Sequence, residues 1–336
     1  MQKNVSLKPY NSFGIDVKTD WLADITSEEQ LLTIIDDLPN MKKLILGGGS
    51  NVLFLNDFNG IVLLNKIKGI RIVSEDENQV TIAIKGGEDW HELVMWAVEK
   101  GYGGIENLAL IPGKAGTVPI QNIGAYGVEV KDVIKQVHTI NMKTCEPKIF
   151  SKDECHFAYR QSIFKLAENK DRYFINEIVI QLQKQAYRPN LKYGTIKSVL
   201  ENNKILSPTV KQIAEAIISI RKSKLPDPKK IGNAGSFFKN PVVDKALFYK
   251  LLKTYPQMPY YILSENEIKI PAGWLIDNAG FKGKRFGNVG VHDKQALVLV
   301  NFGKGTGMDI KNLSDKIRQS VQNQYNIALQ PEVNFI

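Results

Sequence analysis

The spacing of hydrophobic residues along the chain predicts several amphipathic helices. In residues 27–38, apolar side chains recur every three or four positions, and Ser27 and Gln30 form a capping box at the start. Apolar residues also line one face at 89–101 and at about 308–325. Further helices are expected at 209–224, capped by Thr209 with Gln212, and at about 243–255.

Short runs of aliphatic and β-branched residues predict strands between these helices. They lie on both sides of the glycine turn in 42–54 and at residues 60–64, 80–87, 133–140, 173–182, 296–301 and 330–336. Because helices and strands intermix throughout, the expected class is α+β or mixed α/β. The proline-rich segment 225–230 is a plausible domain boundary.

The composition is that of a folded protein with an ordinary core. The chain has 336 residues, of which 43% are hydrophobic and 24% charged. This length predicts two or three domains that need no disulfide or metal for stability. The two cysteines, Cys145 and Cys155, form no C-x-x-C motif, and the four histidines form no H-E-x-x-H pair, so we expect no metal site.

The charge and the N-terminus bear on location and partners. The first residues lack the apolar core of a signal peptide, and no run of about 18 apolar residues is present, so a cytoplasmic protein is expected. The net charge is +9, but no Lys/Arg block reaches five and no nucleic-acid motif occurs. A phosphate-bearing small ligand explains the positive charge at least as well.

Two glycine-rich segments are candidates for ligand contact. The turn GGGSN at 47–51 follows a predicted strand, and its N–H groups can bind phosphate, although a plain tight turn is the simpler interpretation. In 111–127, four glycines allow a flat ligand to approach the backbone, while a loop packed on itself is an equal alternative. The segment GKGTG at 303–307 is better read as a connection into the last helix. Neither the Rossmann nor the P-loop sequence is present.

Three further residues could carry chemistry. Arg160 lies among aromatic and apolar neighbours and needs an anionic partner, which could be a structural carboxylate. Glu332 could be an exposed terminal charge. Ser236 stands in GNAGSFFKNP (232–241) without a nucleophile elbow, so a hydrolase is disfavoured. A proton donor and a buried, satisfied hydroxyl both remain open for this serine.

Seven segments in this order resemble the UDP-N-acetylenolpyruvoylglucosamine reductase family, the MurB flavoenzymes of bacterial cell-wall synthesis. They are SLKPYNSFGI (6–15), LILGGGSNVLF (44–54), ENLALIPGKAGTVPIQNIGAYGVEV (106–130), FAYRQSIFK (157–165), LPDPKKIGNAGSFFKNP (225–241), PAGWLID (271–277) and LQPEVNFI (329–336). Each segment alone is weak, but the ordered set covers essentially the whole chain.

The resemblance implies an α+β fold with an FAD-binding module of the vanillyl-alcohol-oxidase (PCMH) type. That module would span 1–205, with subdomains of about 1–66 and 67–205. A UDP-sugar domain would span 206–325, and the strand 326–336 would carry Glu332 back to the active site. The implied FAD contacts, all non-covalent, are Gly47, Gly48, Gly49, Ser50, Asn51, Pro112, Gly113, Gly116, Thr117, Gln121, Asn122, Gly124, Ala125, Tyr126 and Gly127.

The resemblance also implies the reaction. NADPH reduces FAD, and a hydride then passes from flavin N5 to C3 of the enolpyruvyl group of UDP-N-acetylglucosamine enolpyruvate. Ser236 would protonate C2, while Arg160 and Glu332 stabilise the enolate-like charge. The implied substrate contacts are Tyr193, in the family branch with a tyrosine loop, and Lys224, Asn240, Lys282 and Gln295.

The chain departs from the family pattern at two positions. Gly48 stands where an acidic residue is common, and Val118 stands where a small hydroxyl is common. We expect a monomer that binds neither nucleic acid nor membrane. The alternatives are another FAD oxidoreductase of the same module type, or a UDP-sugar-binding protein that has lost catalysis; the first usually attaches flavin through His or Cys, and no His lies in 44–54 or 106–127.

Overall fold

The computed structural model describes residues 1–184, 187–191 and 194–336. The predicted Tyr193 contact therefore lies outside the described residues. Contacts divide the chain into two compact units. The first comprises Met1–Val5, Thr19–Gly48 and Asn59–Ser223, and the second comprises Ser6–Lys18, Gly49–Phe58 and Lys224–Ile336.

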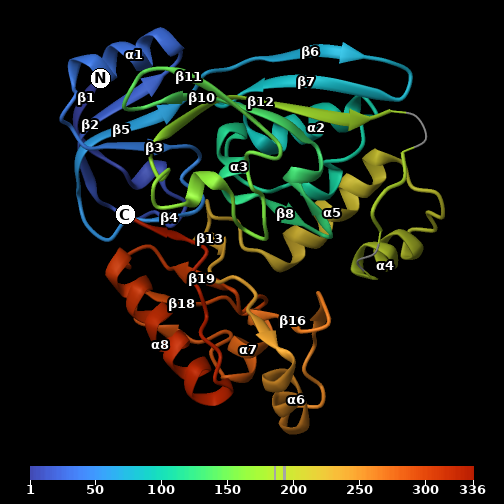
Figure 1. The fold of residues 1–336 in the computed structure, drawn as a ribbon. Helices are drawn as coiled ribbons and strands as arrows, with labels where there is room; N and C mark the ends of the chain where they lie inside the picture. The colour runs from blue at the N-terminus through green and yellow to red at the C-terminus, as the bar shows by residue number, and fades with distance from the viewer. Residues whose placement is uncertain (185–186, 192–193) are drawn as a thin grey trace. The chain divides into compact units, whose positions relative to one another are not determined.

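The first unit contains two sheets, whose strands are labelled in Figure 1. The strands of one sheet precede residue 66 in the sequence, and those of the other follow it. The four-stranded sheet has the order β1 (Gln2–Ser6), β2 (Lys18–Ile25), β5 (Phe58–Asn65) and β3 (Lys43–Leu46). The five-stranded sheet has the order β11 (Pro147–Ser151), β10 (Ile134–Asn141), β12 (Tyr173–Gln183), β7 (Gln79–Lys85) and β6 (Ile70–Glu75), with every neighbouring pair antiparallel. A short hairpin joins β8 (Gly124–Ala125) to β9 (Val128–Glu129).

Helices cover these sheets with the faces that the periodicity predicts. On α1 (Glu28–Asp37), Leu31, Ile34 and Ile35 are buried against residues of β2 and β5, and the Ser27 side chain accepts from Gln30 N–H at the helix start. The second core joins the five-stranded sheet to α2 (Trp90–Glu99) and α5 (Val210–Lys224). Each large apolar side chain buried in this way contributes roughly 1.5–3 kcal/mol. The unit also contains α3 (Val118–Gln121) and α4 (Gly194–Asn202).

The last boundary between the two units lies further along the chain than the predicted domain boundary at 205/206, which stays a prediction. It falls between Ser223 and Lys224, because α5 buries Ile213, Ile217 and Ile220 in the core of the first unit. Residues 6–18 and 49–58 belong by their contacts to the second unit, although they precede most of the first in sequence.

The second unit contains a sheet of order β13 (Gly232–Ser236), β19 (Val298–Asn301), β18 (Val289–Val291) and β17 (Arg285–Phe286). The long helix α8 (Gly307–Tyr325) packs on β18 and β19 and buries Ile310, Leu313, Ile317 and Val321. Thr306 and Asp309 form its capping box, so the segment 303–307 is indeed a helix connection.

The remaining elements of the second unit are short. A three-stranded sheet has the order β14 (Val242–Asp244), β16 (Glu267–Lys269) and β15 (Tyr261–Ile262), followed in the chain by α7 (Ala272–Asn278). Asp244 caps the start of helix α6 (Lys245–Thr254), and β20 (Asn334–Phe335) pairs in parallel with β4 (Val52–Leu53). Among the helices of the described residues, none has the length and apolarity needed to cross a bilayer.

Candidate active site

Two glycines of the turn after β3 lie against the segment predicted to line the flavin. A Cβ on Gly48 would lie 3.0 Å from the Cα of Gly113, and a Cβ on Gly47 would overlap the Thr117 side chain. The turn thus approaches the segment so closely that a side chain at position 48 needs the backbone at Gly113 to move by a few tenths of an ångström. The departure at Gly48 therefore has a steric consequence in this chain.

The rest of the GGGSN turn belongs to the second unit. Gly49 has a φ of 59°, and its carbonyl accepts from the Ser12 N–H at 3.0 Å. The Asn51 side chain donates to the Glu332 carbonyl at 3.2 Å. Asn51 is therefore bonded to the segment that carries a predicted catalytic residue.

The predicted flavin segment, 111–127, is tied to the core by main-chain hydrogen bonds. The N–H groups of Ala115 and Gly116 donate to the carbonyls of Glu88 and Gly86 at 2.9 and 2.8 Å. Its backbone is left-handed at Asn122 and Tyr126, with φ of 45° and 50°, which costs roughly 1–2 kcal/mol per residue. Such backbone strain is common where a loop is shaped for a ligand.

Two side chains of this segment point into the protein. The buried Asn122 amide donates to the Ala158 carbonyl at 2.9 Å and to Glu129 Oε2 at 3.0 Å, so it fixes the loop itself. Val118 is also buried, within the core of the first unit. The hydroxyl that the family pattern suggests at position 118 is therefore replaced by a core contact.

Arg160 lies directly against the same segment. Its Nη2 donates to the Gly124 carbonyl at 2.7 Å and its Nη1 to the Asn122 carbonyl at 3.4 Å. Its own backbone is left-handed, with a φ of 54°. The structure thus brings together a predicted catalytic cation and the predicted flavin loop, held by strained backbone on both sides.

Arg221 is a cation near this site that the sequence reasoning missed. It lies one α-helical turn beyond Ile217 and two beyond Ile213, on the buried face of α5. Burial lowers the pKa of its guanidinium, Tyr126 opposes that shift, and the charge of Arg160 adds to it. Among the described residues its buried Nε has no hydrogen-bond partner. The sequence signal for a buried arginine was its i+4 and i+8 spacing from Ile217 and Ile213, which lie on the apolar face of the predicted helix.

Ser236 is placed by strand pairing and by two buried aromatic rings. It ends β13 opposite Val298 of β19, after Gly235 with a φ of 67°. Phe237 and Phe238 are 0% and 1% exposed, so their rings anchor this segment in the core. Burying the two rings holds the half-exposed serine at a fixed position on the surface of the unit.

Glu332 is attached to the residue that follows Ser236. Its N–H donates to the Phe237 carbonyl at 2.8 Å, and the Lys239 N–H donates to the Gln330 carbonyl at 3.0 Å. These two bonds flank the isolated antiparallel bridge between Phe238 and Pro331. The structure therefore brings together two of the three predicted catalytic residues from opposite ends of the C-terminal third.

Three predicted substrate contacts surround α7. The Asn240 side chain accepts from the Ala272 N–H at 2.9 Å, and Lys282 pairs with Asp277 at 2.8 Å. A Cβ on Gly273 would lie 3.1 Å from Gln295 Oε1. Lys224, a fourth predicted contact, ends α5.

The residues of the first unit fit a bound FAD. The glycine turn and the loop at 113–117 form a close main-chain surface with little room for side chains, as a planar cofactor with phosphates requires. The Asn107 side-chain oxygen is buried and accepts no hydrogen bond from the described residues, so an acceptor is left for a bound group.

Comparison with known proteins agrees with this cofactor. Residues 20–144 match the family described as FAD binding domain, and residues 227–336 match the C-terminal domain of UDP-N-acetylenolpyruvoylglucosamine reductase. The fold is similar to UDP-N-acetylenolpyruvylglucosamine reductase from Thermus caldophilus, with a TM-score of 0.64, 22% identity, and 99% of this chain and 98% of that chain covered. Fold and site together define an FAD-dependent oxidoreductase.

Close relatives narrow the class further. The chain is 48% identical to the UDP-N-acetylenolpyruvoylglucosamine reductase of Flavobacterium johnsoniae, over 100% of this chain and 99% of the relative. It is 47% identical to that of Aliivibrio fischeri, over 99% of this chain and 93% of the relative. The chain belongs to the UDP-N-acetylenolpyruvoylglucosamine reductase family, as its seven segments predicted.

Proposed function

We propose that this reductase converts the enolpyruvyl group of UDP-N-acetylglucosamine enolpyruvate to the lactyl group of UDP-N-acetylmuramate, with NADPH as reductant, for peptidoglycan synthesis. The observation that carries the proposal is the hydrogen bond from Glu332 N–H to the Phe237 carbonyl, beside Ser236. This bond joins the backbone of Glu332 to the residue next to Ser236, which supports a site where a carboxyl group and a hydroxyl group act on the same substrate.

The chemistry that bound FAD supplies is hydride transfer from N5 to C3 of the enolpyruvyl group, after reduction by NADPH. Negative charge then develops on C2 and spreads to the substrate carboxylate. Arg160 binds this charge with its guanidinium, and Glu332 stabilises it in the role of a hydrogen-bond donor. Fixed donors aimed at developing charge lower a barrier by several kcal/mol.

Ser236 completes the reaction by donating its hydroxyl proton to C2. A serine is a weak acid in water, so its position must be fixed and its developing charge stabilised. The buried Phe237 and Phe238 and the pairing with Val298 hold the backbone at this residue. Product formation is then balanced, because C3 gains the hydride and C2 gains the proton.

The second unit binds the UDP end of the substrate in this proposal. Cations and amides suit a diphosphate and a sugar, and Lys224, Asn240, Lys282 and Gln295 supply both. Tyr193, which lies outside the described residues, is a further diphosphate contact in this proposal. The enzyme acts as a cytoplasmic monomer.

The test separates the two half-reactions under anaerobic conditions. We expect NADPH to bleach the flavin absorbance, and UDP-N-acetylglucosamine enolpyruvate to restore it in a second mixing step. Glu332→Gln, which keeps a hydrogen-bond donor, should retain more of the second rate than Glu332→Ala. A reduced enzyme that the enolpyruvyl substrate does not reoxidise would contradict the proposed reaction, and equal rates in the two variants would remove Glu332 from the donor role.

A further inference from the structure

The segment 187–190 crosses both ends of the predicted flavin loop in the first unit. We call this segment the strap. Two of its residues, Tyr187 and Asn190, contact residues just before the loop begins and just where it ends. The strap itself carries no predicted catalytic or binding residue, so the catalytic role proposed above does not explain its contacts.

The first attachment of the strap joins two buried polar groups. Glu106 is 1% exposed, and its carboxylate accepts from the Gly104 N–H at 2.7 Å and from the Tyr187 hydroxyl. The Tyr187 ring lies so close to Gly103 that a Cβ there would overlap it. Burial first, and then the neighbouring Glu106 charge, raise the pKa of Tyr187, so its hydroxyl remains a donor at every pH at which such an enzyme is assayed.

The second attachment ties the strap to the far end of the loop. The Asn107 side chain is 0% exposed, and its Nδ2 donates at 3.0 Å to the carbonyls of both Asn190 and Tyr126. In turn, Asn190 Nδ2 donates to the Gly127 carbonyl at 2.8 Å. Residues 106–107 and 126–127 are thus connected by hydrogen bonds through Asn107 and the strap.

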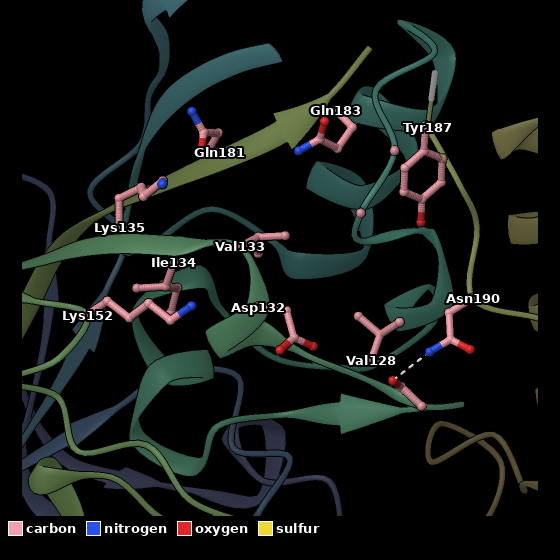
Figure 2. Close-up of a pocket in the computed structure, with 13 residues that line it drawn as sticks. Val128, Asp132, Val133, Ile134, Lys135, Lys152, Gln181, Gln183, Tyr187 and Asn190 are labelled. Carbon is pink, nitrogen blue, oxygen red and sulfur yellow. Dashed lines mark hydrogen bonds between the residues drawn. The ribbon is translucent and has the colours of Figure 1, made fainter. Parts of the chain in front are cut away.

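Packing alone does not hold the strap in place. Tyr187 and Asn190 border a cavity of about 270 Å³ together with Gly103, Gly104 and Gly127 (Figure 2). Figure 2 shows the Asn190 bond to Gly127 at one edge of this cavity, with Tyr187 at another. The cavity leaves part of the strap without neighbouring side chains, so its hydrogen bonds carry more of its attachment than they would in a filled core.

We propose that Tyr187 and Asn190 are positioning residues for the cofactor, which hold the two ends of the loop in the conformation that binds FAD. The inference rests on the proposed assignment of residues 111–127 to the flavin. Neither residue touches the reacting atoms in this proposal. They act through Glu106, Asn107 and the backbone at 126–127.

The test measures FAD release from the holoenzyme by the rise of flavin fluorescence, with the visible spectrum of the bound flavin as a second readout. Tyr187→Phe keeps the ring over Gly103 and leaves the buried Glu106 without its hydroxyl donor, so we expect release at least about tenfold faster. Asn190→Ala should accelerate release about three- to tenfold. The control is Tyr102→Phe, because the Tyr102 hydroxyl also donates to a carboxylate, Glu75, at 3.3 Å, but outside the loop.

The outcomes decide the inference independently of the catalytic proposal. Release from Tyr187→Phe within twofold of the wild-type rate would overturn it, and so would equal acceleration in Tyr102→Phe. Faster release confined to the two strap variants, with an altered flavin spectrum, supports it. If that pattern appears while Ser236→Ala leaves both half-reactions normal, the strap inference stands and the proposed catalytic roles fail.

Discussion

Removing the Ser236 hydroxyl should separate catalysis from stability. The side chain is half-exposed at the end of β13, and its hydroxyl makes no hydrogen bond to the rest of the described chain. The backbone is held by Val298 on the neighbouring strand and by the buried Phe237. Ser236→Ala keeps the Cβ and all of these contacts.

The structure therefore sets two different magnitudes for this one substitution. A half-exposed hydroxyl without a protein partner contributes within about 0.5 kcal/mol to the free energy of unfolding. A positioned general acid contributes about 10²- to 10⁴-fold in rate, which corresponds to about 3–5 kcal/mol of the activation barrier. The rise in activation free energy should be several times larger than the loss in the free energy of unfolding.

The assay is anaerobic stopped-flow absorbance of the flavin, with a thermal melt of the same preparation as the control. Reduction by NADPH should stay within about twofold of the wild-type rate, while reoxidation by the enolpyruvyl substrate slows by two orders of magnitude or more. Equal slowing of both half-reactions would refute the acid role. A large fall in the melting temperature would refute the structural reasoning, because it would show that the hydroxyl has a partner in the fold.

Three other substitutions or reagents test neighbouring parts of the molecule. Arg160→Lys should slow flavin reoxidation at least about tenfold, since a single ammonium cannot bind two loop carbonyls and the substrate as the guanidinium can. Unchanged reoxidation would show that the forked geometry of the guanidinium is not needed. Arg221→Met removes a positive charge that acts on Arg160, so it should raise the KM for the anionic substrate about tenfold. It should not lower the melting temperature, because a buried cation lacking a partner at Nε costs stability; lower stability at constant KM would make Arg221 structural. Burial raises the pKa of the Cys155 thiol to about 12, so at pH 8 only about one molecule in 10⁴ carries its thiolate. A disulfide reagent should therefore react with Cys145 alone in the folded enzyme and with both thiols in denaturant. Two fast-reacting thiols in the folded enzyme would contradict this.

Local pattern was sufficient for the longer amphipathic helices of both units. Periodic apolar residues predicted α1, α2 and α8, because burying one face of a helix demands that spacing whatever lies opposite. The capping pairs at Ser27 and Thr306 lie within four residues of the helix starts they stabilise, so they too can be read locally.

The short elements of the second unit were beyond such reading. Strand β13 consists of Gly232, Asn233, Ala234, Gly235 and Ser236, residues of low strand propensity. It forms because β19 supplies its hydrogen-bond partners and the two phenylalanines after it are buried. Strands of two or three residues, such as β15 and β17, are too short for any period to appear.

The sequence by itself determined the family, and with it which side chains are predicted to carry the chemistry. Its seven ordered segments identified the family, and they marked Arg160, Ser236 and Glu332 as the predicted catalytic residues. Only the tertiary structure decided which distant residues are in contact. Glu332 is bonded to the residue beside Ser236, and Arg221 lies near Arg160. The strap is hydrogen-bonded at both ends of the predicted flavin loop. The physical reason is that periodicity and capping act within a few residues, whereas these contacts join residues far apart in sequence. They form only when burial of both partners repays the entropy of bringing them together.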